Sequence, residues 1–119
     1  MGEINIRVSQ MEGRVPVSVL HVSGDIDAGN HQQLDDKAAE IIDAGAHHII
    51  LDLTETSYMS SAGFRSMHKI HVALQATDSE SASLKLLKPS DEIRRLMKTI
   101  GFDVYISTYD DLTEAVNSF

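Results

Sequence analysis

The chain has 119 residues, no cysteine and a formal net charge of −8. That length fits one folded domain that buries a hydrophobic core without disulfide or metal support. The acidic balance argues against nucleic acid as the main partner, because phosphate binding needs clustered Lys and Arg. No apolar run is long enough to insert into a membrane, and the first residues lack the pattern of a secretory signal. We therefore expect a cytoplasmic protein.

Two strand-like segments open the chain. Ile4, Ile6 and Val8 alternate with polar residues, and residues 15–22 are rich in valine and leucine. Both patterns are typical of β-strands, and the glycine-containing segment at residues 11–14 between them predicts a turn. The two segments would form an antiparallel hairpin.

Helices and strands alternate through the rest of the chain. Residues 24–29 form a loop, and Leu34, Ala38 and Ile41 mark the inner face of a helix that ends near Gly45. The later expected elements are a strand at 49–53, a helix from Ser61 to Ala76, a strand at 84–87, a helix that begins at Pro89 and stops at Gly101, a strand at 104–106 and a helix ending at Phe119. The few clustered basic residues, Arg94, Arg95 and Lys98, fall on one of these helices and indicate a solvated face.

This order of elements predicts the fold class. Alternation after the hairpin implies parallel strands joined by right-handed crossovers. We expect a single α/β domain over residues 1–119, with a mixed, mainly parallel sheet of about five strands and about four helices.

Ser60 and Ser61 stand where the strand at 49–53 feeds a helix. A helix start exposes backbone N–H groups and the positive end of the helix dipole, so a phosphate is tolerated there. A serine at this place can also be a plain N-cap, which contributes about 1 kcal/mol. The two roles are compatible.

The segment from Asp52 to Gly63 resembles the signature of the STAS domain, a family named for sulfate transporters and anti-sigma factor antagonists. It reads Asp-Leu-Thr, three further residues, then Tyr-Met-Ser-Ser-Ala-Gly. The resemblance places the family's phosphorylated serine on Ser61. Ser60 stands where the family has an aspartate, and Ala62 where it has a second hydroxyl. Ser60 is therefore the second candidate acceptor.

A second match lies upstream, where Gly24-Asp25-Ile26-Asp27 resembles the family's loop beside the phosphorylation site. As a bare motif it is equally a strand-to-helix turn. Phe64 is either a partly exposed apolar anchor or a core residue. The partner-binding residues expected from the resemblance are Gly24, Asp25, Asp27, Tyr58, Ser60, Ser61, Gly63, Phe64 and Arg65.

The resemblance implies an anti-sigma factor antagonist. The unphosphorylated protein would bind a kinase-type anti-sigma factor and free a sigma factor. That serine kinase would phosphorylate Ser61 and end the binding, and a phosphatase would restore it. The alternative is an accessory subunit of a lipid-transporting ABC system that binds its ATPase, in which the serine position is interface rather than substrate.

We expect a binding protein and not an enzyme, and the hydrolase reading of Ser61 illustrates why. A hydrolase elbow needs glycine two residues before the serine, and this chain has Met59 there. His68 and His71 are three residues apart on an expected helix, but no carboxylate stands at a recognised metal spacing. We therefore expect no metal and no cofactor.

Overall fold

The computed structural model describes residues 3–119 and contains one five-stranded sheet in the order β1-β2-β3-β4-β5. The strands are β1 (Asn5–Glu12), β2 (Pro16–Ser23), β3 (His48–Glu55), β4 (Ser83–Leu87) and β5 (Ser107–Tyr109). β1 is antiparallel to β2, and every other neighbouring pair is parallel. The predicted mixed, mainly parallel α/β fold is confirmed. Met1 and Gly2, which belong to the segment searched for a secretory signal, lie outside the described residues.

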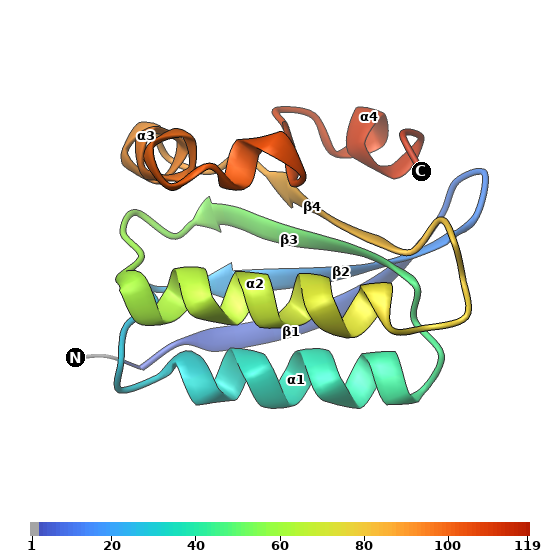
Figure 1. The fold of residues 1–119 in the computed structure, drawn as a ribbon, viewed down its shortest axis with the longest axis horizontal. Coiled ribbons are helices and arrows are strands. Elements are labelled where there is room, and N and C mark those ends of the chain that lie inside the picture. Colours follow the sequence, from blue (N-terminus) through green and yellow to red (C-terminus); the bar gives the residue numbers. More distant parts are fainter. Residues whose placement is uncertain (1–2) are drawn as a thin grey trace.

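The helices cover both faces of this sheet. They are α1 (His31–Asp43), α2 (Ser61–Gln75), α3 (Asp91–Ile100), the 3₁₀ turn η1 (Phe102–Val104) and α4 (Leu112–Val116). α1 and α2 lie side by side across one face (Figure 1). Within residues 3–119 no helix has the length and apolar character needed to cross a bilayer.

Two hydrophobic cores explain why β2 and β3 are apolar along most of their length. Leu20 and Leu51 point toward α1 and α2 and join the larger core with Leu34 and Met67. α3 adds Ile93 and Met97 to this core. On the opposite face, α4 covers the smaller core, formed by Val17, Val19, Ile50, Leu87, Ala115 and Val116. Strands buried on both faces lose the alternation of polar and apolar residues.

The prediction of a strand at residues 104–106 is wrong. Gly101 ends α3 in the left-handed conformation with φ of +84°, and the chain then makes the tight turn η1. Val104 is 85% exposed in this turn, whereas Ile106 is 1% exposed. One inward-facing residue does not make a strand, and pairing with β4 begins only at Ser107.

The start of α3 also differs from the prediction. Pro89 lies before the helix rather than in its first turn, since Ser90 is the N-cap and its hydroxyl accepts a hydrogen bond from the N–H of Ile93 at 3.2 Å. Serine is a preferred cap because its oxygen satisfies an otherwise unpaired helix N–H.

Candidate functional site

Two loops meet where β2 and β3 end. The residues Ile26 and Met59 form an isolated parallel bridge. The N–H of Ile26 donates to the carbonyl of Tyr58 at 3.2 Å, and the N–H of Ser60 donates to the carbonyl of Ile26 at 2.9 Å. The loop at 24–27 and the loop at 57–60 therefore lie side by side, as expected for loops that follow neighbouring parallel strands.

Asp25 ties the two loops together. One oxygen of its carboxylate accepts hydrogen bonds from the N–H groups of Ser57 at 3.1 Å and Tyr58 at 3.0 Å. Asp27 acts within its own loop, where its carboxylate accepts from the N–H of Gly29 at 2.9 Å. Gly24 has a φ of +109°, a conformation that other residues rarely adopt. The Gly-Asp-Ile-Asp segment thus shapes the backbone around the serine loop.

The structure gives Ser60 and Ser61 different environments. Ser60 is the N-cap of α2, and its hydroxyl accepts from the N–H of Ala62 at 3.2 Å. Ser61 is the first residue of α2 and is exposed. Of the two serines, Ser61 presents its side chain to solvent, whereas the hydroxyl of Ser60 is used by the helix start.

The electrostatic setting of Ser61 suits an added negative charge. It stands at the N-terminus of a helix of 15 residues whose first turn contains no acidic residue. The helix dipole stabilises an anion there by about 0.3–1 kcal/mol at an exposed position. Arg65 follows one turn later and is also exposed.

Gly63 and Ala62 are packing residues. A Cβ at Gly63 would lie 2.2 Å from Cγ of Met59 and 3.0 Å from Cγ2 of Ile26, so the two bridged loops leave no room for a side chain. Ala62 is 2% exposed. The position where the family pattern has a second hydroxyl is therefore buried here and offers nothing to a partner.

Two aromatic side chains near the serines differ in exposure. Tyr58 is 44% exposed and stands on the surface of its loop. Phe64 is 6% exposed and belongs to the larger core. Of its two predicted roles, the core residue is correct and the partly exposed apolar anchor is wrong. Its ring lies edge-on to Phe102, with ring centroids 6.1 Å apart.

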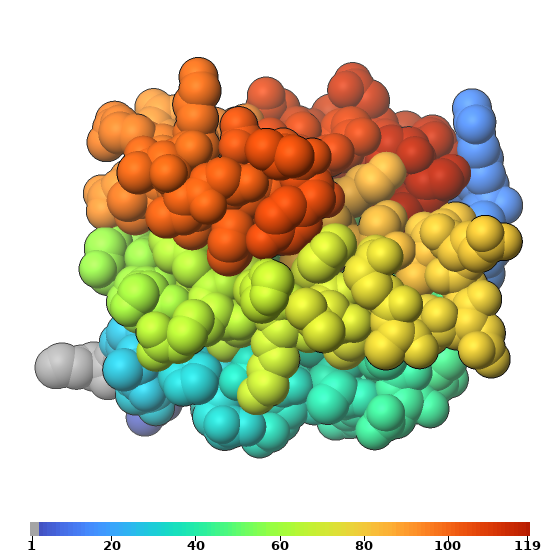
Figure 2. Space-filling view, viewed as in Figure 1, coloured from blue at the N-terminus to red at the C-terminus, as the bar shows by residue number. Residues whose placement is uncertain are grey.

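An apolar groove of about 500 Å³ begins beside Ser61 and runs between α2 and the α3–η1 segment. Figure 2 shows these segments against each other, yellow-green against orange. The groove is lined by Ser61, Phe64, Arg65, His68, Leu96, Ile100, Phe102 and Tyr105. Ile100 and Tyr105 are 47% and 41% exposed. The sequence analysis did not predict this groove, because it assigned residues 104–106 to a strand and so did not predict the η1 turn that forms one wall of the groove.

Histidines continue the groove wall along α2. His68 and His71 lie close to Tyr105, with the His71 and Tyr105 ring centroids 4.6 Å apart. Burial lowers the pKa of His71 below its ordinary value, and neighbouring His68 lowers it further. Among residues 3–119, no cluster of three metal-ligating side chains occurs, and these two histidines belong to an aromatic cluster.

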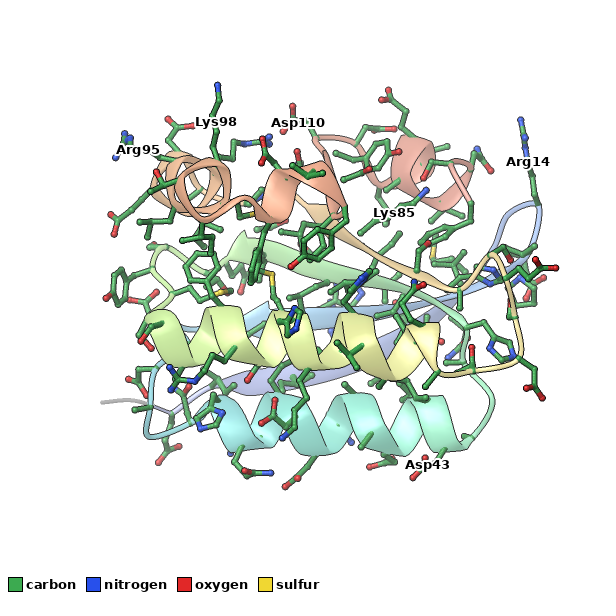
Figure 3. All side chains as sticks on the ribbon, in the orientation of Figure 1. Arg14, Asp43, Lys85, Arg95, Lys98 and Asp110 are labelled. Atoms are coloured by element: carbon green, nitrogen blue, oxygen red, sulfur yellow. The ribbon has the colours of Figure 1, made fainter. Side chains whose placement is uncertain are left out.

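Ser90 is a second residue that sequence reasoning missed. Its hydroxyl donates to the carbonyl of Ser57 at 2.9 Å while it caps α3. The start of α3 is thereby fastened to the serine loop. The basic residues of α3 lie elsewhere. Arg95 and Lys98 point outward, away from α2 (Figure 3), and Arg94 pairs with Asp110 of the segment after β5.

The sequence of the chain matches a known family. A family model described as STAS domain matches residues 9–115, which is most of the chain. The chain belongs to the STAS family. The segment from Asp52 to Gly63, which resembles the family signature, contains the loop at 57–60 and the first three residues of α2, beginning with Ser61.

Solved structures share this STAS fold. An anti-sigma factor antagonist from Mycobacterium paratuberculosis is similar with a TM-score of 0.80 and 22% identity, over 98% of this chain and 94% of that one. A putative anti-sigma factor antagonist from Thermotoga maritima has a TM-score of 0.82 and 15% identity, over 92% and 90%. The Bacillus cell fate determinant SpoIIAA in its phosphorylated form has a TM-score of 0.71 and 19% identity, over 95% and 97%.

Proposed function

We propose that this protein is an anti-sigma factor antagonist whose binding to a kinase-type anti-sigma factor is switched by phosphorylation of Ser61. The observation that carries the proposal is the exposed hydroxyl of Ser61 at the first position of α2, on a loop fixed by Asp25. Proteins described as anti-sigma factor antagonists share the fold, and one similar structure is that of SpoIIAA in a phosphorylated form.

The site supports a switch that acts on the interface rather than on the fold. A phosphate adds about −1.5 to −2 charges and three acceptor oxygens. At the start of α2 that charge is tolerated by the helix. A partner packed against a neutral Ser61 would instead have to remove water from the added charge, at a cost of several kcal/mol if no cation pairs with it.

The groove beside Ser61 gives such a partner apolar surface to contact. Ile100 and Tyr105 are large, partly exposed and line the same groove as the serine, so they offer contiguous apolar surface. A partner that covers them would hold its own surface over Ser61. The kinase partner supplies the catalytic groups, and this protein supplies an accessible hydroxyl.

The test is phosphate mapping followed by titration. The protein is incubated with ATP, Mg²⁺ and each anti-sigma factor kinase of the source genome, and the modified residue is located by fragment mass spectra. We expect phosphate on Ser61. Ser60→Ala is the matched control and should still be phosphorylated, whereas Ser61→Ala should not. Phosphate found mainly on Ser60, or on the serines at 79–83, would contradict the assignment.

Titration then separates the switch from the transporter-subunit alternative. Ser61→Ala should bind the kinase partner as the unmodified protein does, and Ser61→Asp should bind at least about tenfold more weakly, equivalent to 1.4 kcal/mol. Equal affinity of all three proteins would remove the switch. Ser60 and Ala62, which depart from the antagonist pattern, would then favour the accessory subunit that binds an ABC ATPase.

A further inference from the structure

A serine, a histidine and a carboxylate are lined up across β1, β2 and β3, on the face opposite α1 and α2. The hydroxyl of Ser9 lies 2.8 Å from Nε2 of His21. Nδ1 of His21 lies 2.7 Å from the carboxylate of Asp52. The register brings them together, since His21 pairs with Asp52 across the β2–β3 ladder. Nothing in the proposed function uses these three residues.

The protons in this row follow from the chemistry of its members. Hydrogen bonds from the side chain and the N–H of Thr54 hold the pKa of Asp52 below its ordinary value against the opposing effect of burial. The ionised carboxylate can only accept, so Nδ1 of His21 carries the proton and donates to it. In the neutral imidazole Nε2 then carries no proton and can accept the hydroxyl proton of Ser9. This is the proton arrangement of a base-activated serine.

All three side chains are partly exposed, and Ser9 lies outside the hollow that His21 and Asp52 line. The side chains of His21 and Asp52 are 17% and 15% exposed, and both line an open hollow of about 470 Å³. α4 covers the neighbouring positions Val17, Val19 and Ile50 of the same face. A small molecule in this hollow can reach the imidazole, and the partly exposed hydroxyl of Ser9 stands beside that ring, while Thr54 fixes the carboxylate of Asp52.

A cation lines the same hollow. Arg7 pairs with His21 in the β1–β2 ladder and stands two residues before Ser9, so that both side chains leave β1 on the same face. The exposed side chain of Arg7 therefore brings a positive charge to the same face of the sheet as the row.

We propose that Ser9 is a nucleophilic serine that takes an acyl group from an activated ester, with His21 as its base and Asp52 as the residue that positions His21. The Oγ of Ser9 forms a bond to the carbonyl carbon while its proton passes to Nε2 of His21. The bond from that carbon to the leaving oxygen then breaks, and the leaving alcohol departs with the proton from Nε2. Asp52 remains ionised and stabilises the imidazolium. The products are acylated Ser9 and the free alcohol.

The test uses p-nitrophenyl acetate on the full chain, with acid quenching and fragment mass spectra to locate the acetyl group. We expect acetylation of Ser9 faster than of any other serine. His21→Gln and Asp52→Asn should each slow it by at least about tenfold, because a positioned base contributes about 10²–10⁴-fold. A profile of the Ser9 acetylation rate against pH is recorded for the unaltered protein and for His21→Gln, and a profile that His21→Gln leaves unchanged would overturn the proposal.

Ser23 is the matched control. It lines the same hollow, but its hydroxyl donates to the carboxylate of Glu55 at 2.8 Å and has no histidine partner. It should stay unmodified, and Ser23→Ala should not change the rate at Ser9. Acetyl groups confined to lysines or His21, or equal rates at Ser9 with and without the imidazole, would overturn the proposal. Ser61→Ala should react normally at Ser9, which keeps this result separate from the proposed switch. Circular dichroism melts verify that each variant is folded.

Discussion

The carboxylate of Asp25 accepts a hydrogen bond from the N–H of Tyr58 at 3.0 Å, across 33 residues of chain. The same oxygen accepts from the N–H of Ser57. One side chain on the loop after β2 therefore sets the conformation of the loop after β3, which carries the serines.

Asp25→Ala should loosen the serine loop. It removes the acceptor for two backbone N–H groups, which water can partly replace because the site is exposed, so we expect a loss of about 1 kcal/mol in the free energy of unfolding. Asp25→Asn keeps one acceptor oxygen, so its free energy of unfolding should fall by less than that of Asp25→Ala. Urea denaturation measures the loss, and amide exchange at Ser57 and Tyr58 should speed up in Asp25→Ala. Unchanged exchange at both amides would show that Asp25 does not fix the loop.

Gly63→Ala should destabilise the domain although alanine favours helix. The helix gain is about 1 kcal/mol. The added Cβ would meet Cγ of Met59 at 2.2 Å, and such overpacking costs about 1–3 kcal/mol. Gly29→Ala is the control, because its nearest neighbour, the carboxylate of Asp27, lies at an ordinary 3.4 Å. A rise in melting temperature for Gly63→Ala would mean that Met59 repacks freely.

Ser60→Ala and Ser61→Ala should differ in stability. Ser60 caps α2, and loss of such a cap costs about 1 kcal/mol. Ser61 is exposed at the first helical position, where alanine is a good substitute, so its variant should be within about 0.5 kcal/mol of the unaltered protein. Chemical denaturation of the two single variants makes the comparison. Equal losses would show that both hydroxyls support the helix start.

Stability should fall as the pH drops below the ordinary histidine range. Burial is the largest effect that lowers the pKa of His48 and of His71 from 6.5. At pH values between the lowered pKa values and 6.5, the unfolded chain binds more protons than the folded one. The free energy of unfolding therefore rises with pH through that window, and above it the stabilisation from the two neutral imidazoles has its full value.

The measurement is a series of urea melts from pH 7.5 to about pH 5, which spans the titration of histidine. The double variant His48→Gln/His71→Gln should show a flatter dependence over this range. Arg65→Gln is a useful control because it removes an exposed charge on α2 without removing an imidazole. The same slope in the double variant would assign the pH dependence to other groups.

The sequence predicted the order of elements well because apolar periodicity and glycine stops are local signals. The helix that begins at Ser61 was predicted correctly in this way, whereas the approach of the loops at 24–27 and 57–60 was expected from the family resemblance. The strand at 104–106 was misplaced, since Val104, Tyr105 and Ile106 have strand-like side chains but follow a left-handed Gly101 that forces a turn.

Features that depend on contacts distant in sequence were not predictable from the chain alone. The hydrogen bond from Ser90 to Ser57 joins the start of α3 to the serine loop. No pattern in the sequence around either residue predicts this contact. The row of Ser9, His21 and Asp52 exists only because three strands share one register. The burial of Phe64 depends on Phe102, which no pattern placed beside α2.

The bridge between Ile26 and Met59 extends the sheet's pairing past the ends of β2 and β3, into the serine loop itself. With Asp25 and Ser90 it fixes the backbone before any partner arrives. Binding to a preorganised loop loses little conformational entropy. Association should therefore resemble the docking of two rigid surfaces, with a rate set by orientation and charge, and changes in affinity should be expressed mainly in how fast the complex dissociates.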